Sequence, residues 1–350
     1  MLSPHIAFLF EEENIMYIMD IDLKLQDWAF AQRKYLPYEL KLILTEKRIR
    51  EWYDFWQGDV YVSLSGGLDS TYLLYRVREL YPDVEAVFCD TGLEYPELKD
   101  FIKTIPNVTI IRPEKSFRQI IKDYGYPLIS KETAAKIRKL RNGNLSDRYR
   151  NYLLHGDERG KLGKLAEKWK FLIDAPFDIS ERCCDICKKN PFKKFHKKTG
   201  KYPFIGITQD EGFQRQRQYE RTGCNIFDGN RPKSQPLGFY RRQDILRGIA
   251  ENKIPYCSIY GDIKQDKEGN YYNTGVQRSG CMFCAFGCHL EKYPNRFQRM
   301  QTTHPKLYEY CMRDWDKGGL GMAYVLDYAN IPYLNNVVTT EHNIQQYKLF

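Results

Sequence analysis

Residues 61–74 of the chain read YVSLSGGLDSTYLL. Alternating apolar residues at Val60, Val62 and Leu64 predict a buried strand, two adjacent glycines end it, and helical spacing resumes at Ser70. A strand, a tight glycine turn and a helix N-terminus direct several backbone N–H groups at one point, where the helix dipole adds partial positive charge. The segment therefore predicts a site for a phosphate or a pyrophosphate.

The residues of this turn have separate expected roles. Gly66 and Gly67 permit a close approach of the backbone to a ligand, which a Cβ would hinder. Asp69 is expected to act in catalysis by holding Mg²⁺ against phosphate oxygens. Further hydrogen-bond donors are the hydroxyl groups of Ser65, Ser70 and Thr71. No Gly-Lys-Ser/Thr follows, so the turn is not a Walker loop. The alternative is an ordinary glycine turn in an α/β sheet.

Two more buried strands are predicted at residues 84–92 and 107–113, with a helix at 96–104 between them. Strands separated by helices of this length favour an α/β fold with a doubly wound, mainly parallel sheet and a cysteine-rich C-terminal portion. Ligands of such sheets bind beyond the carboxyl ends of the strands, where the sequences SGGLDS and DTGLEYPE fall. We expect an N-terminal helical extension, a nucleotide-binding domain and a cysteine-containing C-terminal segment, over residues 1–57, 58–260 and 261–350.

Length and charge narrow the class of protein. A chain of 350 residues with a formal net charge of +9 is long enough for one elaborated α/β domain or two. No stretch approaches the roughly 18 apolar residues of a membrane span, and the start of the chain turns acidic after a short apolar run, unlike a secretory signal. We therefore expect a cytoplasmic enzyme without a membrane partner.

Positive charge is concentrated in residues 131–170, which hold twelve Lys or Arg against five Asp or Glu. With a loop at 141–146, the segment is predicted to be a helical insertion in the nucleotide-binding domain. Such a segment suits a polyanionic partner such as tRNA or DNA. A solvated helical face is the alternative.

The motifs resemble those of a known family. SGGLDST at 65–71 resembles the pyrophosphate loop of the ATP-pyrophosphatase (PP-loop, adenine nucleotide α-hydrolase-like) superfamily. DTGLEYPE at 90–97 resembles the DTGxxFPE segment of its phosphoadenosine phosphosulfate (PAPS) reductase family. That resemblance implies nucleotide contacts at Asp90, Thr91 and Gly92, with Glu94 nearby. A capping box between Thr91 and Glu94 is an alternative that is compatible with these contacts.

A third segment of the sequence contains an arginine that could bind an anionic group of the nucleotide. Residues 203–219, PFIGITQDEGFQRQRQY, resemble the family's G-x-x-x-x-E-S-x-x-R segment, with Gly206, Glu211 and Arg215 matching and Gly212 in place of the serine. By this resemblance Arg215 binds a phosphate or sulfate of the nucleotide, which suits a planar and permanently charged group. A surface arginine on a helix is the alternative.

Six of the ten cysteines lie in two clusters, at 183–187 and 281–288. Four thiolates that converge from two loops suit either a [4Fe–4S] cluster or tetrahedral zinc, and unliganded buried thiols are the third reading. ERCCDICKKNPF at 181–192 and RSGCMFCAFGCH at 278–289 resemble the cysteine elements of iron-sulfur adenylyl-sulfate reductases. This resemblance implies one [4Fe–4S] cluster held by Cys183, Cys184, Cys281 and Cys284. The CxxC spacing at Cys184 and Cys187 keeps zinc open.

One family element is absent. The reductases share a C-terminal ECGxH tail whose cysteine attacks the sulfate sulfur, and this sequence has no such tail. Cys288 beside His289 is a candidate substitute, because an imidazolium would lower the pKa of the thiol.

Three functions follow as hypotheses. The first is cleavage of ATP to AMP and pyrophosphate with Mg²⁺, which activates an acceptor for sulfur transfer from a donor protein and uses the [4Fe–4S] cluster. The second is reduction of adenylyl sulfate or PAPS, with Cys288 or Cys224 as the nucleophile. The third is a non-catalytic protein that binds nucleotides or nucleic acid.

Overall fold

The computed structural model describes residues 27–229 and 231–335. The chain forms two units. The first contains the described parts of Met1–Cys89, Pro96–Ile111 and Phe192–Ser279, and the second those of Asp90–Tyr95, Arg112–Pro191 and Gly280–Phe350. This division differs from the contiguous ranges expected from the sequence, because the chain leaves the first unit after its third strand and later returns to it. Residues 1–26 of the expected N-terminal extension lie outside the described residues.

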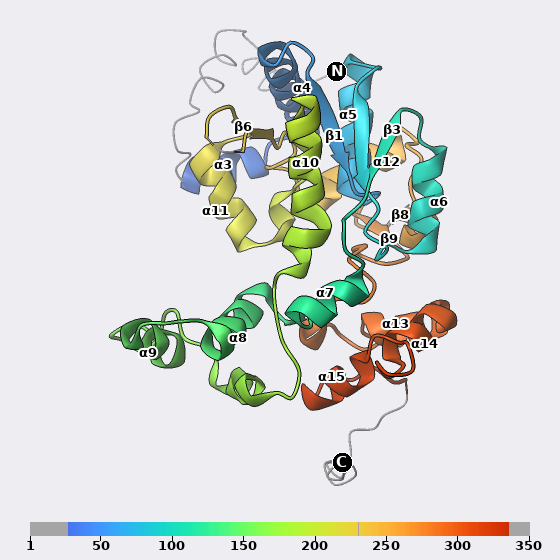
Figure 1. Ribbon diagram of the computed structural model, residues 1–350. Coiled ribbons are helices and arrows are strands. Elements are labelled where there is room, and N and C mark those ends of the chain that lie inside the picture. The colour runs from blue at the N-terminus through green and yellow to red at the C-terminus, as the bar shows by residue number, and fades with distance from the viewer. Residues whose placement is uncertain (1–26, 230, 336–350) are drawn as a thin grey trace. The chain divides into compact units, whose positions relative to one another are not determined.

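The first unit is built on a six-stranded sheet with the order β3-β2-β1-β5-β7-β6 (Figure 1). All neighbouring strands are parallel except β6 and β7. The mainly parallel α/β sheet predicted from the sequence is thereby confirmed. The strands are Val60–Leu64 (β1), Glu85–Cys89 (β2), Val108–Ile111 (β3), Tyr202–Ile205 (β5), Asn225–Ile226 (β6) and Lys233–Ser234 (β7).

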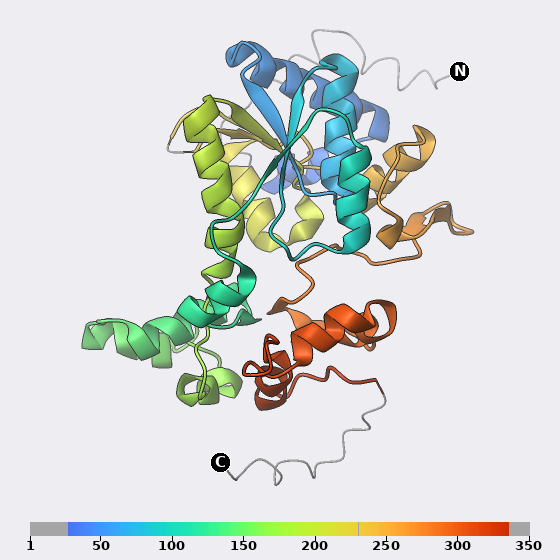
Figure 2. The same ribbon diagram turned by 45° about the vertical axis from the view of Figure 1, so that its right-hand side comes forward.

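Helices cover both faces of this sheet (Figure 2). Because side chains alternate along a strand, Tyr61 points to the opposite face from Val62. The Tyr61 ring packs edge-on against Phe195 of α10 (Asn190–Thr199), with 5.1 Å between centroids. On the other face Phe204, the register partner of Val62, packs against Trp52 of α4 (Tyr38–Phe55). The sheet is therefore doubly wound, as expected.

The first unit has further helices and a hairpin among its described residues. They are α3 (Asp27–Lys34), α5 (Leu68–Leu80), α6 (Pro96–Thr104), η3 (Gln209–Glu211), α11 (Phe213–Thr222), α12 (Arg242–Glu251), η4 (Ser258–Tyr260) and the antiparallel hairpin of β8 (Ile263–Gln265) and β9 (Tyr271–Asn273).

The strand order fixes where a ligand can bind. From β1 the chain moves outward in one direction through β2 and β3, and then returns to place β5 on the other side of β1. Between β1 and β5 the connections therefore diverge, and in sheets of this type ligands bind at the carboxyl ends of the two strands where this occurs. The SGGLDS loop follows β1 directly, so it lies at this switch point.

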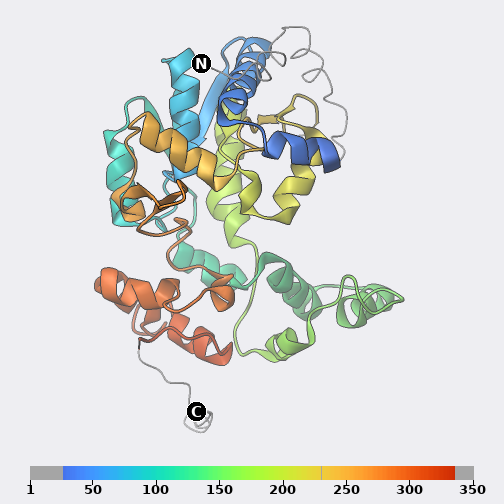
Figure 3. The ribbon, with the colours of Figure 1, turned by 180° about the vertical axis from the view of Figure 1, so that it is seen from behind.

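The second unit is largely helical, with one short parallel sheet of β4 and β10 (Figure 3). Its core contains the aliphatic residues of these elements together with Cys183, Cys187, Cys288 and Cys311. The elements are α7 (Phe117–Tyr124), β4 (Leu128–Ile129), α8 (Lys131–Asn142), α9 (Asp147–His155), η1 (Glu167–Asp174), η2 (Asp185–Lys189), β10 (Ala285–Phe286), η5 (Cys288–Leu290), α13 (Arg296–Thr303), α14 (Pro305–Met312) and α15 (Met322–Tyr328). Within the basic segment, α8 and α9 are separated near residues 141–146, and the segment belongs to the second unit.

Among the helices of residues 27–229 and 231–335, none combines the length and the apolar character that crossing a bilayer requires.

A buried ion pair joins α4 to α12. Lys41 is fully buried, and its Nζ donates to Asp244 Oδ2 at 2.6 Å and to the carbonyl of Lys34 at 2.8 Å. Asp244 also accepts the backbone N–H of Arg241, which caps α12. Burial lowers the pKa of Lys41, and the hydrogen bond from Lys41 to Asp244 opposes that shift.

We predict that Asp244→Ala lowers the free energy of unfolding by about 3–5 kcal/mol, because it leaves a buried ammonium group without its counter-ion. Adding Lys41→Met in that background is expected to restore part of the loss. Denaturant unfolding measures both. Glu46→Ala, which breaks the exposed pair with Arg50, is the control and is expected to cost less than about 1 kcal/mol. Equal losses for the two alanine variants would contradict the prediction.

Candidate functional site

The SGGLDS loop is closed by its own hydroxyl groups. Ser65 N–H donates to Ser70 Oγ at 3.1 Å, Ser70 Oγ donates to the carbonyl of Gly67 at 3.0 Å, and Gly67 N–H donates to Ser65 Oγ at 3.3 Å. The hydroxyls of Ser65 and Ser70, which the sequence analysis assigns to ligand contact, thus shape the loop. Since Gly67 is the N-cap of α5, the first-turn amides of Leu68, Asp69 and Ser70 lack carbonyl partners within the helix.

Two glycines make this geometry possible. Gly66 has a φ of +73°, and a Cβ there would lie 2.6 Å from Leu98 Cδ2. Gly206, which follows β5, is more constrained, because its Cβ would lie 2.8 Å from Ser70 Cα in the backbone of α5. The end of β5 thus touches the start of α5. This contact holds the helix N-terminus at the switch point of the sheet.

Asp69 lies among arginines. Its Oδ1 is buried, has no hydrogen-bond partner within residues 27–229 and 231–335, and lies 3.6 Å from Nη1 of Arg242. Burial raises the pKa of Asp69, while the charges of Arg242 and Arg278 oppose that rise and Asp210 adds to it. Both arginines donate a hydrogen bond to Asp210. The backbone N–H of Arg242 donates to Asp210 Oδ2 at 2.6 Å, and Nη2 of Arg278 donates to the Asp210 carbonyl at 2.7 Å. A carboxylate that is incompletely paired beside two cations can hold a metal ion next to phosphates.

Sequence reasoning missed these partners. Arg242 begins α12, for which the sequence predicted no ligand contact, and Arg278 lies just before the second cysteine cluster. Tyr260 and Ser279, which share a hydrogen bond, lie over Gly67, where a Cβ would be 3.5 Å from Tyr260 Oη. The doubled arginine at 241–242 was the available signal. Thr71, predicted as a ligand contact, is buried, and its Oγ1 has no hydrogen-bond partner among the described residues.

Arg215 is exposed on α11. The pKa of Lys233 is lowered by burial and further by the nearby charges of Arg215 and Arg231. Three cations thus lie close together, an arrangement that favours an anion as ligand. The side chain of Glu211 lies outside the described groups.

The predicted DTG contacts lie in a self-contained loop of the second unit. Asp90 Oδ1 accepts the N–H of Gly92 at 3.2 Å, and its Oδ2 lies 3.3 Å from Arg112. Thr91 is buried, and its Oγ1 donates to Glu94 at 2.6 Å while Glu94 accepts the Thr91 N–H at 3.0 Å. These hydrogen bonds close the turn within the motif itself. α6 begins two residues after Glu94, at Pro96. Nucleotide contact at these residues stays a prediction.

Both cysteine clusters are attached to one short segment, residues 126–129. On one side Tyr126 N–H donates to the carbonyl of Asp178 at 2.7 Å and its carbonyl accepts Ser180 N–H at 3.0 Å, which leads into the first cluster. On the other side the carbonyl of Ile129 accepts the N–H of Gly287 at 2.7 Å. Gly287 directly follows β10, the strand that comes after Cys284. The two clusters are therefore brought together by a shared backbone ladder.

This segment requires special backbone geometry. Gly125 has a φ of +98°, and its Cβ would lie 2.3 Å from the backbone of Asp178, so only glycine fits. Ile129 is a β-branched residue with a φ of +65°, which costs on the order of 1–3 kcal/mol. The surrounding core compensates for this strain, since Ile129 is 1% exposed.

The cysteines line one apolar cavity of the second unit, bordered by Leu93, Phe117, Pro127, Cys183, Cys184, Cys187, Lys188, Cys281 and Cys284. Of the first cluster, Cys187 lies in a π-helical turn, η2, and Cys183 and Cys184 directly precede it; such turns are rare and are frequent at functional sites. The charges of Cys281 and Cys184 raise the pKa of the Lys188 ammonium. Lys188 is exposed, but it borders the cavity, so its ammonium group lies near the thiols.

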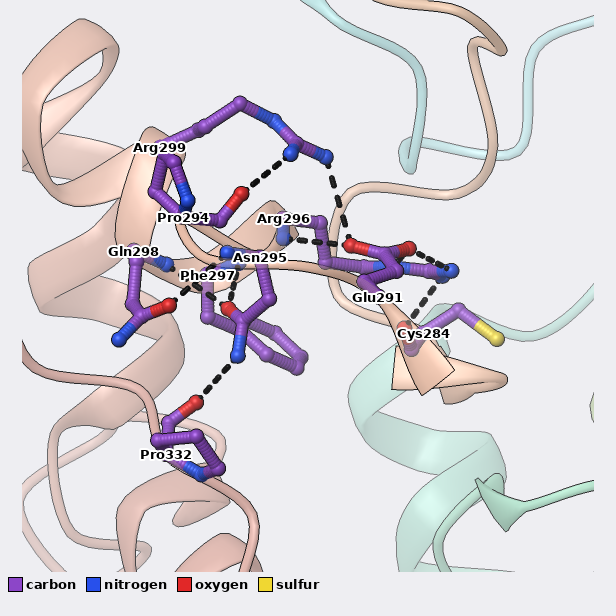
Figure 4. Close-up of polar contacts among 9 residues, drawn as sticks. All are labelled: Cys284, Glu291, Pro294, Asn295, Arg296, Phe297, Gln298, Arg299 and Pro332. Atoms are coloured by element: carbon purple, nitrogen blue, oxygen red, sulfur yellow. Dashed lines mark hydrogen bonds and ion pairs between the residues drawn. The ribbon is translucent and has the colours of Figure 1, made fainter. Parts of the chain in front are cut away.

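An arginine contacts the backbone of the second cluster (Figure 4). Arg296 Nη1 donates to the carbonyl of Cys284 at 2.8 Å, and its Nε and Nη2 donate to Glu291 Oε1 at 2.8 and 2.5 Å. The other carboxylate oxygen of Glu291 accepts the N–H of Arg296 at 2.7 Å. Asn295 caps α13 by accepting two backbone N–H groups. The arginine therefore ties the Cys281–Cys284 loop to the start of α13.

The thiols differ in acidity. Cys183 Sγ donates a hydrogen bond to Cys184 Sγ at 4.0 Å. This bond lowers the pKa of Cys184, as do the charges of Lys131 and Lys188. The same bond raises the pKa of Cys183. Burial raises the pKa of Cys284 and of Cys288 to about 12. Cys288, proposed as a nucleophile, is thus buried and protonated in this conformation. Burial also lowers the pKa of His289, which opposes the expected imidazolium.

Within the described part of the chain, no group of three or more His, Cys, Asp or Glu lies in metal-coordinating arrangement. The donor chemistry nevertheless fits a soft metal centre, because four or more thiols and a compensating lysine surround one cavity.

A separate cavity of about 270 Å³ lies at the opposite end of the sheet, beside Gly58, Val84, Glu85 and Lys201. These residues precede or begin the strands β1, β2 and β5, so the cavity is away from the switch point. We assign it no function.

Residues 146–288 match the family model described as "Phosphoadenosine phosphosulfate reductase domain". The matched range includes both cysteine clusters and Arg215, whereas the SGGLDS loop precedes it. The chain is similar to two uncharacterised proteins of Methanocaldococcus jannaschii, at 24% identity over 79% of this chain and 46% of the relative, and at 23% over 74% and 49%. The chain thus spans about half the length of the curated relatives it matches.

Among solved structures, the chain is similar to a phosphoadenylyl-sulfate (PAPS) reductase from Candida auris in a phosphate complex. That likeness has a TM-score of 0.37 and 15% identity over 71% of this chain and 99% of the other. It is too distant to support an argument about the site.

We predict that iodoacetamide alkylates Cys184 of the metal-free protein faster than Cys284 or Cys288 near neutral pH, because the thiolate is the reactive form. Mass spectrometry of the derived peptides measures the three rates. Lys131→Met is expected to slow the reaction of Cys184 by removing a charge that lowers its pKa. Equal rates at all three cysteines, or no effect of the substitution, would contradict the prediction.

Proposed function

We propose that the chain is a nucleotide-utilising enzyme of the phosphoadenosine phosphosulfate reductase family, whose domain model matches residues 146–288. Its best-supported reaction is cleavage of ATP to AMP and pyrophosphate, which activates an acceptor for sulfur transfer. The observation that carries this proposal is the position of Asp69 and the free amides of α5 at the sheet's switch point, beside Arg242 and Arg278.

The residues of this site divide the work of phosphate binding. The amides of Leu68 and Ser70 would hold the oxygens of the pyrophosphate portion, where the helix dipole favours negative charge. Arg242 and Arg278 would neutralise charge that develops on the leaving pyrophosphate. Mg²⁺ would be held by Asp69 and would polarise the phosphate oxygens. The hydroxyl–backbone bonds of Ser65 and Ser70 keep the loop in shape before the nucleotide arrives.

The reaction balances as two displacements and one hydrolysis. An acceptor oxygen forms a bond to the α-phosphorus while the bond from the α-phosphorus to the bridging oxygen breaks, so pyrophosphate leaves with that electron pair and the acceptor proton passes to solvent. The thiocarboxylate sulfur of a donor protein then bonds to the activated carbon of the acceptor, while the bond from that carbon to oxygen breaks and AMP leaves with the electron pair. Water then adds to the donor's carbonyl and breaks its C–S bond, which leaves the sulfur on the acceptor and a carboxylate on the donor. The donor is a required partner of the proposal.

The thiol cavity is the proposed second centre. Cys183, Cys184, Cys281 and Cys284 would hold a [4Fe–4S] cluster, with zinc as the alternative metal and Cys187 as an alternative ligand to Cys183. The cluster would supply a soft site for the transferred sulfur. Lys188 would offset the negative charge of the thiolates, and Arg296 would fix the Cys281–Cys284 loop. The thiol donor set and the lysine support this assignment.

Reduction of adenylyl sulfate or PAPS is the second candidate, favoured by the family membership itself. The burial of Cys288 and the raised pKa of its thiol oppose this residue as the attacking thiolate in the described conformation. Cys224 is also buried, and it shares a hydrogen bond with Tyr219. The reductase therefore requires a conformational change that exposes a thiol.

A product assay separates the candidates. The full chain is incubated with Mg²⁺ and labelled ATP, adenylyl sulfate or PAPS, together with a thiol donor. Pyrophosphate from ATP supports activation, and sulfite from the other two nucleotides supports reduction. Nucleotide binding without either product overturns both in favour of a non-catalytic binding protein. Asp69→Asn is expected to lower either rate at least about 100-fold, and Asp100→Asn, a substitution of an exposed carboxylate, is the control.

The raised pKa of Asp69 predicts a pH dependence of nucleotide binding. Below this pKa the carboxyl is protonated, so Mg²⁺-nucleotide must displace a proton, and affinity falls as the pH is lowered through that value. Calorimetry in buffers of different ionisation enthalpy measures the released proton. In Asp69→Asn we expect no such proton release. Release that persists in this variant would remove Asp69 from the metal site.

Metal content tests the thiol centre. We expect anaerobically purified protein to contain iron and to absorb near 400 nm, and the variants Cys183→Ser, Cys281→Ser and Arg296→Met to lose at least half of it. Cys257→Ala, which alters a buried cysteine of the first unit, is the matched control. Zinc in place of iron would show that zinc is the bound metal. Full metal retention in Cys281→Ser would show that Cys281 is not a ligand.

A further inference from the structure

The α9 surface is defined here as α9 and the loop that follows it, residues 147–168. It lies at one end of the second unit, with α13, α14 and α15 at the other end (Figures 1 and 3). Every residue from 147 to 152 is exposed, and α9 attaches to its unit mainly through buried Leu153. A helix that exposes so much of its length contributes little to the core, so its side chains are available for a partner.

Positive charge on this surface is not neutralised internally. Six exposed cations have no ion-pair partner among the described residues, namely Arg148, Arg150, Arg159, Lys161, Lys164 and Lys168. By contrast, the other cations of the basic segment are engaged within the unit, as in the pairs of Lys136 with Glu132 and Arg138 with Glu181. Four carboxylates lie on the same surface, at Asp147, Asp157, Glu158 and Glu167, so its formal net charge is +2. The surface thus presents a net positive field suited to phosphates.

Two tyrosines on this surface are exposed and already oriented. The rings of Tyr149 and Tyr152 are each 37% exposed and nearly parallel, at 16° and 6.2 Å between centroids. Lys139 Nζ donates to Tyr149 Oη at 3.0 Å, and Tyr152 packs on Gly163, where a Cβ would lie 2.0 Å from the ring. Because their orientation is fixed before binding, little side-chain entropy is lost when a base stacks on them.

The loop that carries Arg159 and Lys161 is also preformed. Asp157 Oδ1 accepts the N–H groups of Lys161 at 2.8 Å and Leu162 at 3.1 Å, and the Asp157 N–H donates to the carbonyl of Leu162 at 2.9 Å. These bonds close the turn and hold the two cations beside α9. The cations and the tyrosine pair therefore form one rigid surface.

We propose that the α9 surface binds a single-stranded segment of nucleic acid. The cations contact its phosphates, and the paired tyrosines stack on its bases, the combination by which proteins hold single strands without reading base edges. A solvated helical face would not need two exposed, parallel aromatic rings. The inference rests on this surface alone and requires no nucleotide at the SGGLDS loop, so either proposal can fail without the other.

Fluorescence anisotropy with the full chain tests the inference, using labelled 15-nucleotide oligo-U, oligo-dT and a duplex of equal length, without ATP. We expect both single strands to bind more tightly than the duplex, and their order identifies RNA or DNA as the preferred source. Tyr149→Ala and Tyr152→Ala are each expected to weaken binding at least about fivefold. Arg148→Ser with Arg150→Ser is expected to reduce the salt slope of log affinity by about 1.4.

The matched control removes two cations elsewhere. Lys197 and Lys198 are exposed on α10 in the first unit, and Lys197→Ser with Lys198→Ser is expected to leave binding unchanged. Equal losses in the control and the arginine variant, tighter binding of the duplex, or no binding at low salt would overturn the proposal. Preference for an acidic polypeptide over oligo-U would also overturn it. Because the arginines are exposed, their variant stays informative even if a tyrosine variant is poorly folded.

Discussion

The hydrogen bonds on both sides of residues 126–129 hold the second unit together. One side of this short segment binds the strand that leads to Cys183, and the other side binds the strand that follows Cys284. The cysteine clusters are about a hundred residues apart in sequence, and they line one cavity because they share this ladder. Gly125 is required for the close approach, since no other residue fits against the backbone of Asp178.

The first unit depends on an equivalent contact. Gly206 packs against the backbone of Ser70, so the end of β5 supports the start of α5. The helix N-terminus and Asp69 are thereby held where the sheet connections diverge. The two arginines beside Asp69 come from α12 and from the stretch before the second cysteine cluster, and Asp210 anchors both. The SGGLDS loop and the thiol cavity thus each depend on a glycine that admits a close backbone contact.

Local patterns were sufficient to predict much of this fold. The strand at 60–64, the helix at 96–104 and the parallel order follow from short-range periodicity and from the handedness of connections. The interleaving of the two units did not follow, because it depends on which distant strands pair. Arg242 and Arg278 were missed for the same reason, since their role depends on proximity to Asp69. The possible cap formed by Thr91 and Glu94 is present as two hydrogen bonds between these residues, and the helix starts at Pro96, as predicted.

Ile129 combines a left-handed backbone with a buried, branched side chain at the end of the shared ladder. Its unfavourable torsion is tolerated only while the strands on either side stay paired. Loss of the hydrogen bonds on one side of residues 126–129 would remove part of that support. The hydrogen bonds on the other side would then break more easily. The thiol set is therefore expected to open cooperatively, with the Tyr126 and Gly287 amides losing their protection from solvent exchange together.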